Sequence, residues 1–289
     1  ARGRPAPIRL RTRTPLKVAV VGERFQIEEK VVVEGPAGDF SLGGGGTLAA
    51  LNLDVEGAVS VQLLEPYFRS KFEELDGELT AKAKLGGSLS EPRLTGSVIL
   101  RDIAIKPVGQ DASVKVPTGK IEFTNDQLSI TGVSLVVEDE FSSESAELTI
   151  GGGVKLADFE PRLWAVQIDG QLAGKMLLVF APEAFSAASG IADLSIALLG
   201  TGTTPDIDGR IEFDDENPLT LVPRGLRREL TMTQGALTFT EQLIEFEQVR
   251  GWFDDEGRIT DVTGEVELRD LRPTEIDISV SARNVPFRV

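Results

Sequence analysis

The chain has 289 residues, of which 41% are hydrophobic and 6% aromatic, and 30 Lys and Arg against 46 Asp and Glu give a formal net charge of −16. This charge argues against nucleic acid as a partner, because phosphate backbones are repelled by an acidic surface. The chain contains no Cys and no His, which excludes Cys-based zinc sites, Cys nucleophiles and Ser-His-Asp triads. No run of about 18 apolar residues occurs, so the sequence predicts no membrane-spanning helix.

The N-terminal segment is basic, unlike the rest of the chain. Six basic residues precede the first acidic residue, Glu23: Arg2, Arg4, Arg9, Arg11, Arg13 and Lys17. Lys and Arg commonly protect the edge strands of a sheet from pairing, and a solvated edge strand is the interpretation we favour. A local contact with lipid head groups is the alternative.

Helical spacing occurs in two segments, and alternation covers most of the remaining chain. The segments 63–75 and 175–189 each contain a proline, Pro66 and Pro182, so they predict two short helices. Apolar and polar residues alternate in 79–83, 98–100, 121–123, 128–130, 133–137, 148–150, 154–156, 166–168, 194–198, 211–213, 237–239, 244–246, 266–268 and 276–280. This period of two predicts about twenty strands, each with one apolar and one solvated face. Two short helices cannot cover so many strands.

The chain also repeats itself. A shift of 113 residues aligns Gly57, Gly77, Pro92 and Gly96 with Gly170, Gly190, Pro205 and Gly209. Shifts of 116 and 112 residues align 119–133 with 235–249 and 152–161 with 264–273. We interpret 57–169 and 170–289 as two copies, preceded by an incomplete unit at 1–56, in one continuous elongated structure.

Three stretches within these copies resemble a known family. They are LGGSLSEPRLTGSVILRDIAI (85–105), GKIEFTNDQLSI (119–130) and GALTFTEQLIEF (235–246). Their order and duplication resemble the TamB and AsmA-like family over essentially 48–289. The resemblance implies a long, twisted, mostly antiparallel sheet that curls into a taco-like hydrophobic groove, with one or two short helices. It also implies a periplasmic protein that conducts phospholipids between the inner and outer membranes and supports outer-membrane assembly and integrity.

The same resemblance sets the expected partners. Phospholipids would bind in the groove, and an outer-membrane β-barrel protein would bind through regions outside or C-terminal to this chain. Family members are anchored to the inner membrane by a segment that we expect to lie outside this chain. No enzymatic activity, cofactor or metal is expected.

The groove needs an apolar lining, and the alternating residues are the candidates for it. They are Val98, Leu100, Ile121, Phe123, Leu128, Ile130, Leu148, Ile150, Val166, Ile168, Ile196, Ile211, Phe213, Leu237, Phe239, Ile244, Phe246, Val266, Leu268, Ile276 and Ile278. The alternative is that they form the sealed core of a structural or adhesive β-solenoid. That architecture favours a repeat of about 20–30 residues, much shorter than the period found here.

Three acidic triplets, 138–140, 214–216 and 254–256, follow apolar strand ends. Clustered carboxylates can bind Ca²⁺, but none of the triplets fits the spacing of a known calcium loop. Paired carboxylates can also hydrolyse glycosides, yet no other group converges on these acids in the sequence. We interpret the triplets as solubilising turn residues.

Overall fold

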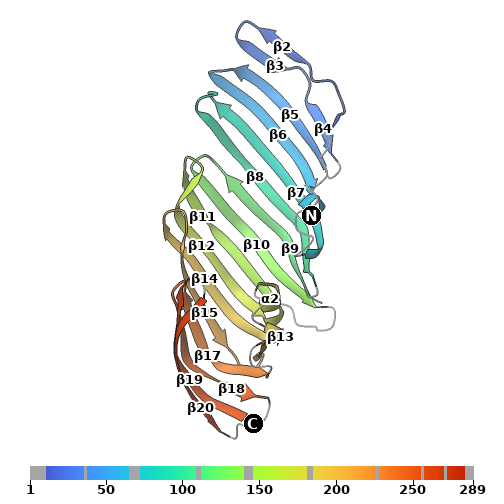
Figure 1. Ribbon diagram of the computed structural model, residues 1–289. Helices are drawn as coiled ribbons and strands as arrows, with labels where there is room; N and C mark the ends of the chain where they lie inside the picture. The colour runs from blue at the N-terminus through green and yellow to red at the C-terminus, as the bar shows by residue number, and fades with distance from the viewer. Residues whose placement is uncertain are drawn as a thin grey trace, which may run out of the picture. The chain divides into compact units, whose positions relative to one another are not determined.

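The computed structural model describes residues 11–35, 38–64, 72–108, 112–139, 146–180, 185–224, 228–254, 257–269 and 272–283. Strands account for 81% of the structure and helix for 3%, and the strands form one large antiparallel sheet that is not closed into a barrel (Figure 1). The described residues contain twenty strands, close to the number that the alternation predicts. The prediction of an all-β, mostly antiparallel fold is confirmed.

The chain folds into two compact units. The first unit contains the described residues up to 108 together with 115–133 and 152–162, and the second unit contains 112–114, the described residues of 134–151, and those from 163 onward. These ranges interleave, whereas the sequence repeat divides the chain at 56/57 and 169/170. That division remains a prediction.

The first unit is a meander of antiparallel strands. Its elements are β1 (Arg11–Thr12), β2 (Val18–Val21), β3 (Arg24–Ile27), β4 (Val31–Gly35), β5 (Gly38–Thr47), β6 (Ala50–Ser60), the 3₁₀ turn η1 (Val61–Leu64), β7 (Phe72–Gly87) and β8 (Pro92–Pro107). Strands β4 to β8 pair in chain order. One half of β5 pairs with β4 and the other half with β3, while β1 and β2 pair with β4 and β3.

A run of four glycines allows β5 to change partners. Gly44 has a φ of 105°, and a Cβ there would lie 2.1 Å from the carbonyl oxygen of Asn52 on β6. A side chain at this position would therefore clash with the neighbouring strand, and glycine also adopts the positive φ without strain.

Four further strands contribute residues to both units: β9 (Ala112–Phe123), β10 (Gln127–Asp139), β11 (Ala146–Ala157) and β12 (Glu160–Ala173). The second unit adds α2 (Gly174–Phe180), β13 (Phe185–Ser189), β14 (Ile191–Thr201), β15 (Asp206–Phe213), β16 (Leu219–Pro223), β17 (Leu230–Thr240), β18 (Leu243–Phe253), β19 (Gly257–Arg269) and β20 (Arg272–Arg283). The order of pairing is β12, β14, β15, β17, β18, β19 and β20. Strand β16 pairs with β13 and with the start of β17.

The elements follow one another in the same order in the two predicted copies. η1 corresponds to α2, and β9, β10, β11 and β12 correspond to β17, β18, β19 and β20. The long strands β7 and β8 correspond to the pairs β13/β14 and β15/β16. In the first copy the β7–β8 register shifts at Gly77, which has a φ of 114°, and in the second copy the chain breaks at the matching Gly190, with a φ of 80°. A bulge in one copy is thus a break between strands in the other.

The predicted helices are shorter than the sequence pattern indicates. Of 63–75, the described residues are the end of η1 and the start of β7 at Phe72, so the helix is wrong at 72–75; 65–71 lie outside the described residues. Of 175–189, α2 ends at Phe180 and 185–189 form β13, so the helix is wrong there as well. Ala187, Ala188 and Ser189 pair with β16, and this sheet pairing overrides the helix propensity of alanine.

Among the described residues, no helix has the length and apolar character needed to cross a membrane.

Gly96 and Gly209, which the repeat aligns, both lie inside strands, β8 and β15. A Cβ at Gly209 would lie 2.2 Å from the ring of Phe239, and one at Gly96 would lie 2.6 Å from the ring of Phe123. The two glycines leave space for aromatic rings that lie across the apolar face.

Candidate functional site: an apolar face in each unit

In the second unit, apolar side chains form two parallel rows across seven strands. The first row follows the register Ile168, Ile196, Gly209, Phe239, Ile244, Val266 and Ile276. The second row follows Gly170, Leu194, Ile211, Leu237, Phe246, Gly264 and Ile278. Directly paired residues of antiparallel strands lie on the same face of the sheet, so the two rows form one surface. This surface is the apolar face of the second unit.

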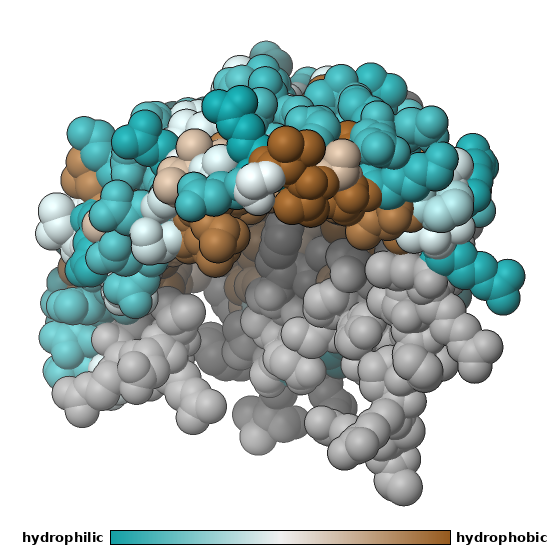
Figure 2. Space-filling model, turned by 90° about the horizontal axis from the view of Figure 1, so that it is seen from above, coloured by the Kyte–Doolittle hydropathy of each residue, from teal (hydrophilic) through white to brown (hydrophobic). Residues whose placement is uncertain are grey.

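The first unit has a corresponding surface. One row joins Val31, Leu42, Val55, Ala83 and Gly96, and the next joins Val33, Phe40, Gly57, Ala81 and Val98. Leu79 pairs with Leu100 and extends this apolar face of the first unit by a further row. The end of the first unit faces the viewer in Figure 2, where hydrophilic residues cover most of the outer side and hydrophobic residues gather on the hollowed side.

The opposite face of the first unit is charged and internally paired. Glu56 on β6 and Lys82 on β7 are 2.7 Å apart, and Asp54 and Lys84 are 3.7 Å apart. The hydrogen bond and the positive charge of Lys82 lower the pKa of Glu56. These pairs are well exposed to solvent, so they contribute solubility and register more than stability.

The second unit repeats this arrangement. Arg210 on β15 contacts Glu212 at 2.6 Å and Glu247 on β18 at 2.8 Å, and hydrogen bonds to these two carboxylates raise the pKa of Arg210. On the same face, Glu245, Glu265 and Asp277 pair directly across β18, β19 and β20.

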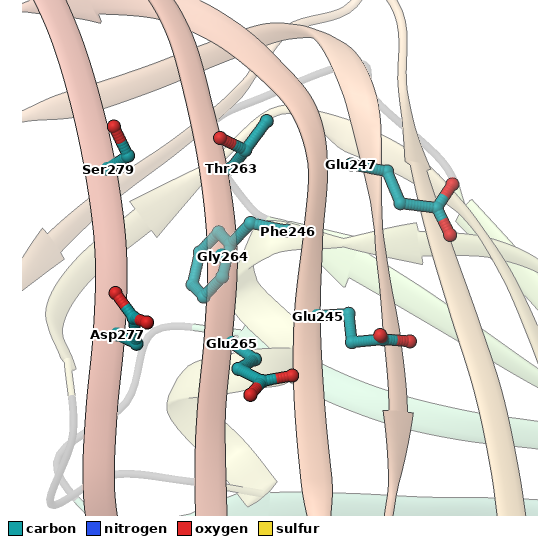
Figure 3. Close-up of a pocket in the computed structure, with 8 residues that line it drawn as sticks. All are labelled: Glu245, Phe246, Glu247, Thr263, Gly264, Glu265, Asp277 and Ser279. Carbon is teal, nitrogen blue, oxygen red and sulfur yellow. The ribbon is translucent and has the colours of Figure 1, made fainter.

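Figure 3 shows the three acids lying side by side in a shallow recess of about 370 Å³. The ring of Phe246, by contrast, belongs to the apolar row. Among the described residues, no group of three or more acidic side chains has the geometry to hold a metal ion. The carboxylate of Asp214, in the second predicted triplet, accepts the N–H of Glu216 at 2.9 Å, which lowers the pKa of Asp214 and closes the turn after β15. Residues 140, 255 and 256 of the other triplets lie outside the described residues.

Most of the predicted lining residues are partly exposed. Fifteen of them belong to this class: Val98, Leu100, Ile121, Phe123, Leu128, Ile130, Ile150, Ile168, Ile196, Ile211, Leu237, Phe239, Ile244, Phe246 and Ile278. Strand pairing places ten of the fifteen on the apolar faces described above, and Phe123 joins them through its position over Gly96. Four are buried, namely Leu148, Val166, Phe213 and Val266. The side chains of Leu268 and Ile276 lie outside the described part of the structure.

The helix α2 explains the burial of Leu148. Met176 of α2 is fully buried and packs with Leu148, Leu172 and Leu194 in one cluster. Phe213 packs in a second cluster with Leu219 and two further residues. Leu194 belongs to the second apolar row, so the core of the second unit is continuous with its apolar face, and the buried members themselves offer no surface to a ligand.

Sequence reasoning missed part of the apolar face in the first unit. Phe40, Leu42 and Val55 lie on it, and Val55 is 38% exposed. Their alternation is visible in the sequence, but the adjoining glycine run 43–46 breaks the pattern.

Comparisons with protein-family models, with curated proteins and with solved structures found no match to the chain.

Proposed function

We propose that the chain binds phospholipid acyl chains along its apolar faces and conducts them through an aqueous compartment. The observation that carries the proposal is the pair of rows across seven strands, in which large apolar side chains stay partly exposed while the other face is charged. Soluble proteins rarely expose a contiguous apolar patch larger than a few hundred Å². Acyl chains provide a cover whose burial contributes about 0.8 kcal/mol per CH₂.

The wider setting of this proposal rests on the sequence resemblance. It comprises a periplasmic location, an anchor in the inner membrane outside this chain, transport of phospholipid between the two membranes, and a β-barrel partner in the outer membrane. The anionic charge of the outer faces fits the proposal, since it keeps the protein soluble while head groups remain in water.

The competing proposal is a structural or adhesive β-solenoid with a sealed core. The solvent exposure of the two apolar rows distinguishes it from a lipid-binding protein. A sealed core buries its apolar residues, as the cluster around Met176 does. Phe239 and Phe246 pack against the clusters of Met176 and Phe213, yet they and Ile244 remain partly exposed. An open sheet also fits binding better than a closed core does.

The first test is recovery of lipid from the purified chain. We expect extraction into organic solvent and mass spectrometry to yield phospholipid, and a fluorescent fatty acid to bind in competition with it. Val55→Asp places a charge on the apolar face at an exposed position, and Ile130→Asp places one at a partly exposed lining candidate on β10. Each change should weaken fatty-acid binding to the first unit by about tenfold or more and leave binding to the second unit intact, because an ionised carboxylate is costly beside an acyl chain.

The matched control lies next to Ile130 on the opposite face. Thr131 is exposed, so Thr131→Asp adds the same charge to the same strand without touching the apolar face. We expect it to bind fatty acid as the unaltered chain does. An extract without phospholipid, or equal binding by the Ile130→Asp and Thr131→Asp variants, would show that the apolar face is not a lipid site.

A further inference from the structure

The β2–β3 hairpin exposes more apolar side chain than any other short segment of the described chain. Leu16, Val18, Val20 and Val21 are 57%, 44%, 67% and 79% exposed. Of the thirteen large hydrophobic residues that are exposed in the described structure, these four lie within six consecutive positions. Scattered exposed apolar residues need no explanation, but a cluster of this kind marks an interaction site.

Both faces of the hairpin contribute to this cluster. Val18 and Val20 pair with Ile27 and Phe25 and continue the apolar face of the first unit. Val21 projects from the other face and pairs with Arg24 across the turn at Gly22. The end of the hairpin therefore exposes valine on both faces, with Glu23 in the turn between the strands.

Protection of a sheet edge does not account for the valines. The structure places the described basic residues at an edge, as the sequence predicts: β1 and β2 pair with β4 and β3, and Arg13 forms an ion pair with Glu34. Protected edges carry charged residues or proline at exposed positions, whereas this edge carries Val-Ala-Val-Val. Within the described chain, Lys17 and Arg24 form no ion pair.

The charge of this end is opposite to that of the remaining chain. The described part of this end, residues 11–30, contains five basic and three acidic residues, a net charge of +2, whereas residues 31–289 carry −21. An anionic surface therefore attracts this end and repels the other parts of the chain.

We propose that the β2–β3 hairpin docks on an anionic lipid surface, inserting Val20 and Val21 among the head groups while Lys17 and Arg24 contact the lipid phosphates. Apolar insertion combined with basic residues is the combination that holds proteins at the surface of anionic bilayers. A second copy of the chain fits this edge less well, because both copies would present the same positive charge. The inference goes beyond the proposed function, since docking does not require acyl chains on the apolar faces.

The absence of cysteine makes a direct test possible. Val21→Cys carries an environment-sensitive dye at the hairpin, and Leu199→Cys carries the same dye on the charged face of β14, where Leu199 is 47% exposed. Mixed phosphatidylcholine–phosphatidylglycerol vesicles should shift the emission of the Val21→Cys protein to shorter wavelength and leave the Leu199→Cys protein unchanged. Phosphatidylcholine vesicles alone, or high salt, should abolish most of the shift, because screening weakens the electrostatic part.

Flotation of unlabelled variants with the same vesicles measures the two contributions. Lys17→Gln combined with Arg24→Gln should lower binding to anionic vesicles by about thirtyfold, since each basic residue near the surface contributes about fivefold. Val20→Asp combined with Val21→Asp should lower it by about tenfold or more. Leu199→Asp, on the charged face of β14, is the matched control and should bind normally; circular dichroism checks that all variants are folded.

Three results would overturn the proposal. One is equal binding to neutral and anionic vesicles, and another is equal loss in the hairpin variants and the Leu199→Asp control. The third is concentration-dependent dimerisation through β2, detected by analytical ultracentrifugation, with no vesicle binding. These outcomes leave fatty-acid binding by the apolar faces untouched, so failure of docking and failure of the proposed function can be told apart.

Discussion

Phenylalanine rings lie over glycine residues at matching positions of the two predicted copies. Phe239 covers Gly209, and Phe123, which the repeat aligns with Phe239, covers Gly96. A ring over a strand glycine shields the backbone on the apolar face and makes the sheet smoother there. The pairing also explains why both residue types recur with the repeat, since each requires the other.

The Gly209–Phe239 contact predicts that Gly209→Ala changes the free energy of unfolding in opposite directions with and without the Phe239 ring. Gly209→Ala should destabilise the protein by about 1–3 kcal/mol, because the new Cβ would overlap the ring at 2.2 Å. In a Phe239→Ala background the overlap is gone, and the same change should stabilise by about 0.5–1 kcal/mol, since alanine suits a strand interior better than glycine. Urea denaturation of the four proteins in this double-mutant cycle measures both effects. Destabilisation of equal size in both backgrounds would show that the ring does not occupy this position.

A second prediction concerns a bulge in the β17–β18 pair. Gln248 has a φ of 50°, and the register of the two strands shifts beside it. The repeat aligns Gln248 with Gly132, which has a φ of 59°. A non-glycine residue in this region is strained, so Gln248→Gly should stabilise the protein by about 1 kcal/mol.

Gln171→Gly is the control for this change. Gln171 is an exposed glutamine on β12 in ordinary extended pairing, and its replacement should destabilise by about 0.5–1 kcal/mol. Thermal melting of the two variants should therefore move the midpoint in opposite directions. A lower midpoint for Gln248→Gly would mean that the glutamine side chain contributes more than the strain costs.

At the scale of elements, α2 is the one described α-helix, and it is held by a single deeply buried residue. Met176 is fully buried against β11, β12 and β14. Met176→Ala should cost about 2–4 kcal/mol, the range for removing a large side chain from a packed core. Val280→Ala, at an exposed position, should change stability by less than about 0.5 kcal/mol. If chemical denaturation gave similar values for both, α2 would not be packed on the sheet as described.

A hydrogen bond from β15 to Glu241, in the turn after β17, predicts that the stability of the fold depends on pH. The carboxylate of Glu241 accepts its own backbone N–H and that of Ile207, the latter at 3.1 Å, and these bonds lower the pKa of Glu241. A lowered pKa stabilises the fold above the ordinary pKa of the group, and this contribution is lost as the pH falls through the folded value. Glu241→Gln should therefore melt at a lower temperature than the unaltered chain at pH about 7, and the difference should close between about pH 5 and 3. A difference that is independent of pH would assign the effect to packing.

The elements were predictable to different degrees. Alternation identifies most strands and their faces, because a period of two places every second side chain on the same side. It does not identify neighbours: β17 lies beside β15 as well as β16, and nothing in 214–229 reveals that β16 pairs with β13. The helical pattern at 185–189 fails because these small residues pair with β16. The burial of Leu148 depends on α2, which no periodicity places.

At the scale of the whole molecule, each unit has its own apolar face and its own charged face. Fifteen of the proposed lining residues are partly exposed, and strand pairing places ten of them on these apolar faces, while their role as a lipid lining stays a prediction. The sequence does not predict which apolar residues become core, as Phe213 does beside Leu219. A protein that only stores lipid could use the two faces independently, whereas one that conducts lipid must use both.

Conduction therefore predicts that the two apolar faces act as consecutive steps in lipid transfer. Val55→Asp places a charge on the apolar face of the first unit, and Ile244→Asp places one on the apolar face of the second unit. If lipid passes along both faces, either change alone should slow transfer between donor and acceptor vesicles by about tenfold or more, and the double variant should be little slower than the worse single one. Fatty-acid binding should fall only partly in each single variant, because the other face remains intact. Two separate binding sites in place of a path would give a different result. Each single variant would then lose only about half of the transfer rate, and the two losses would combine independently in the double variant.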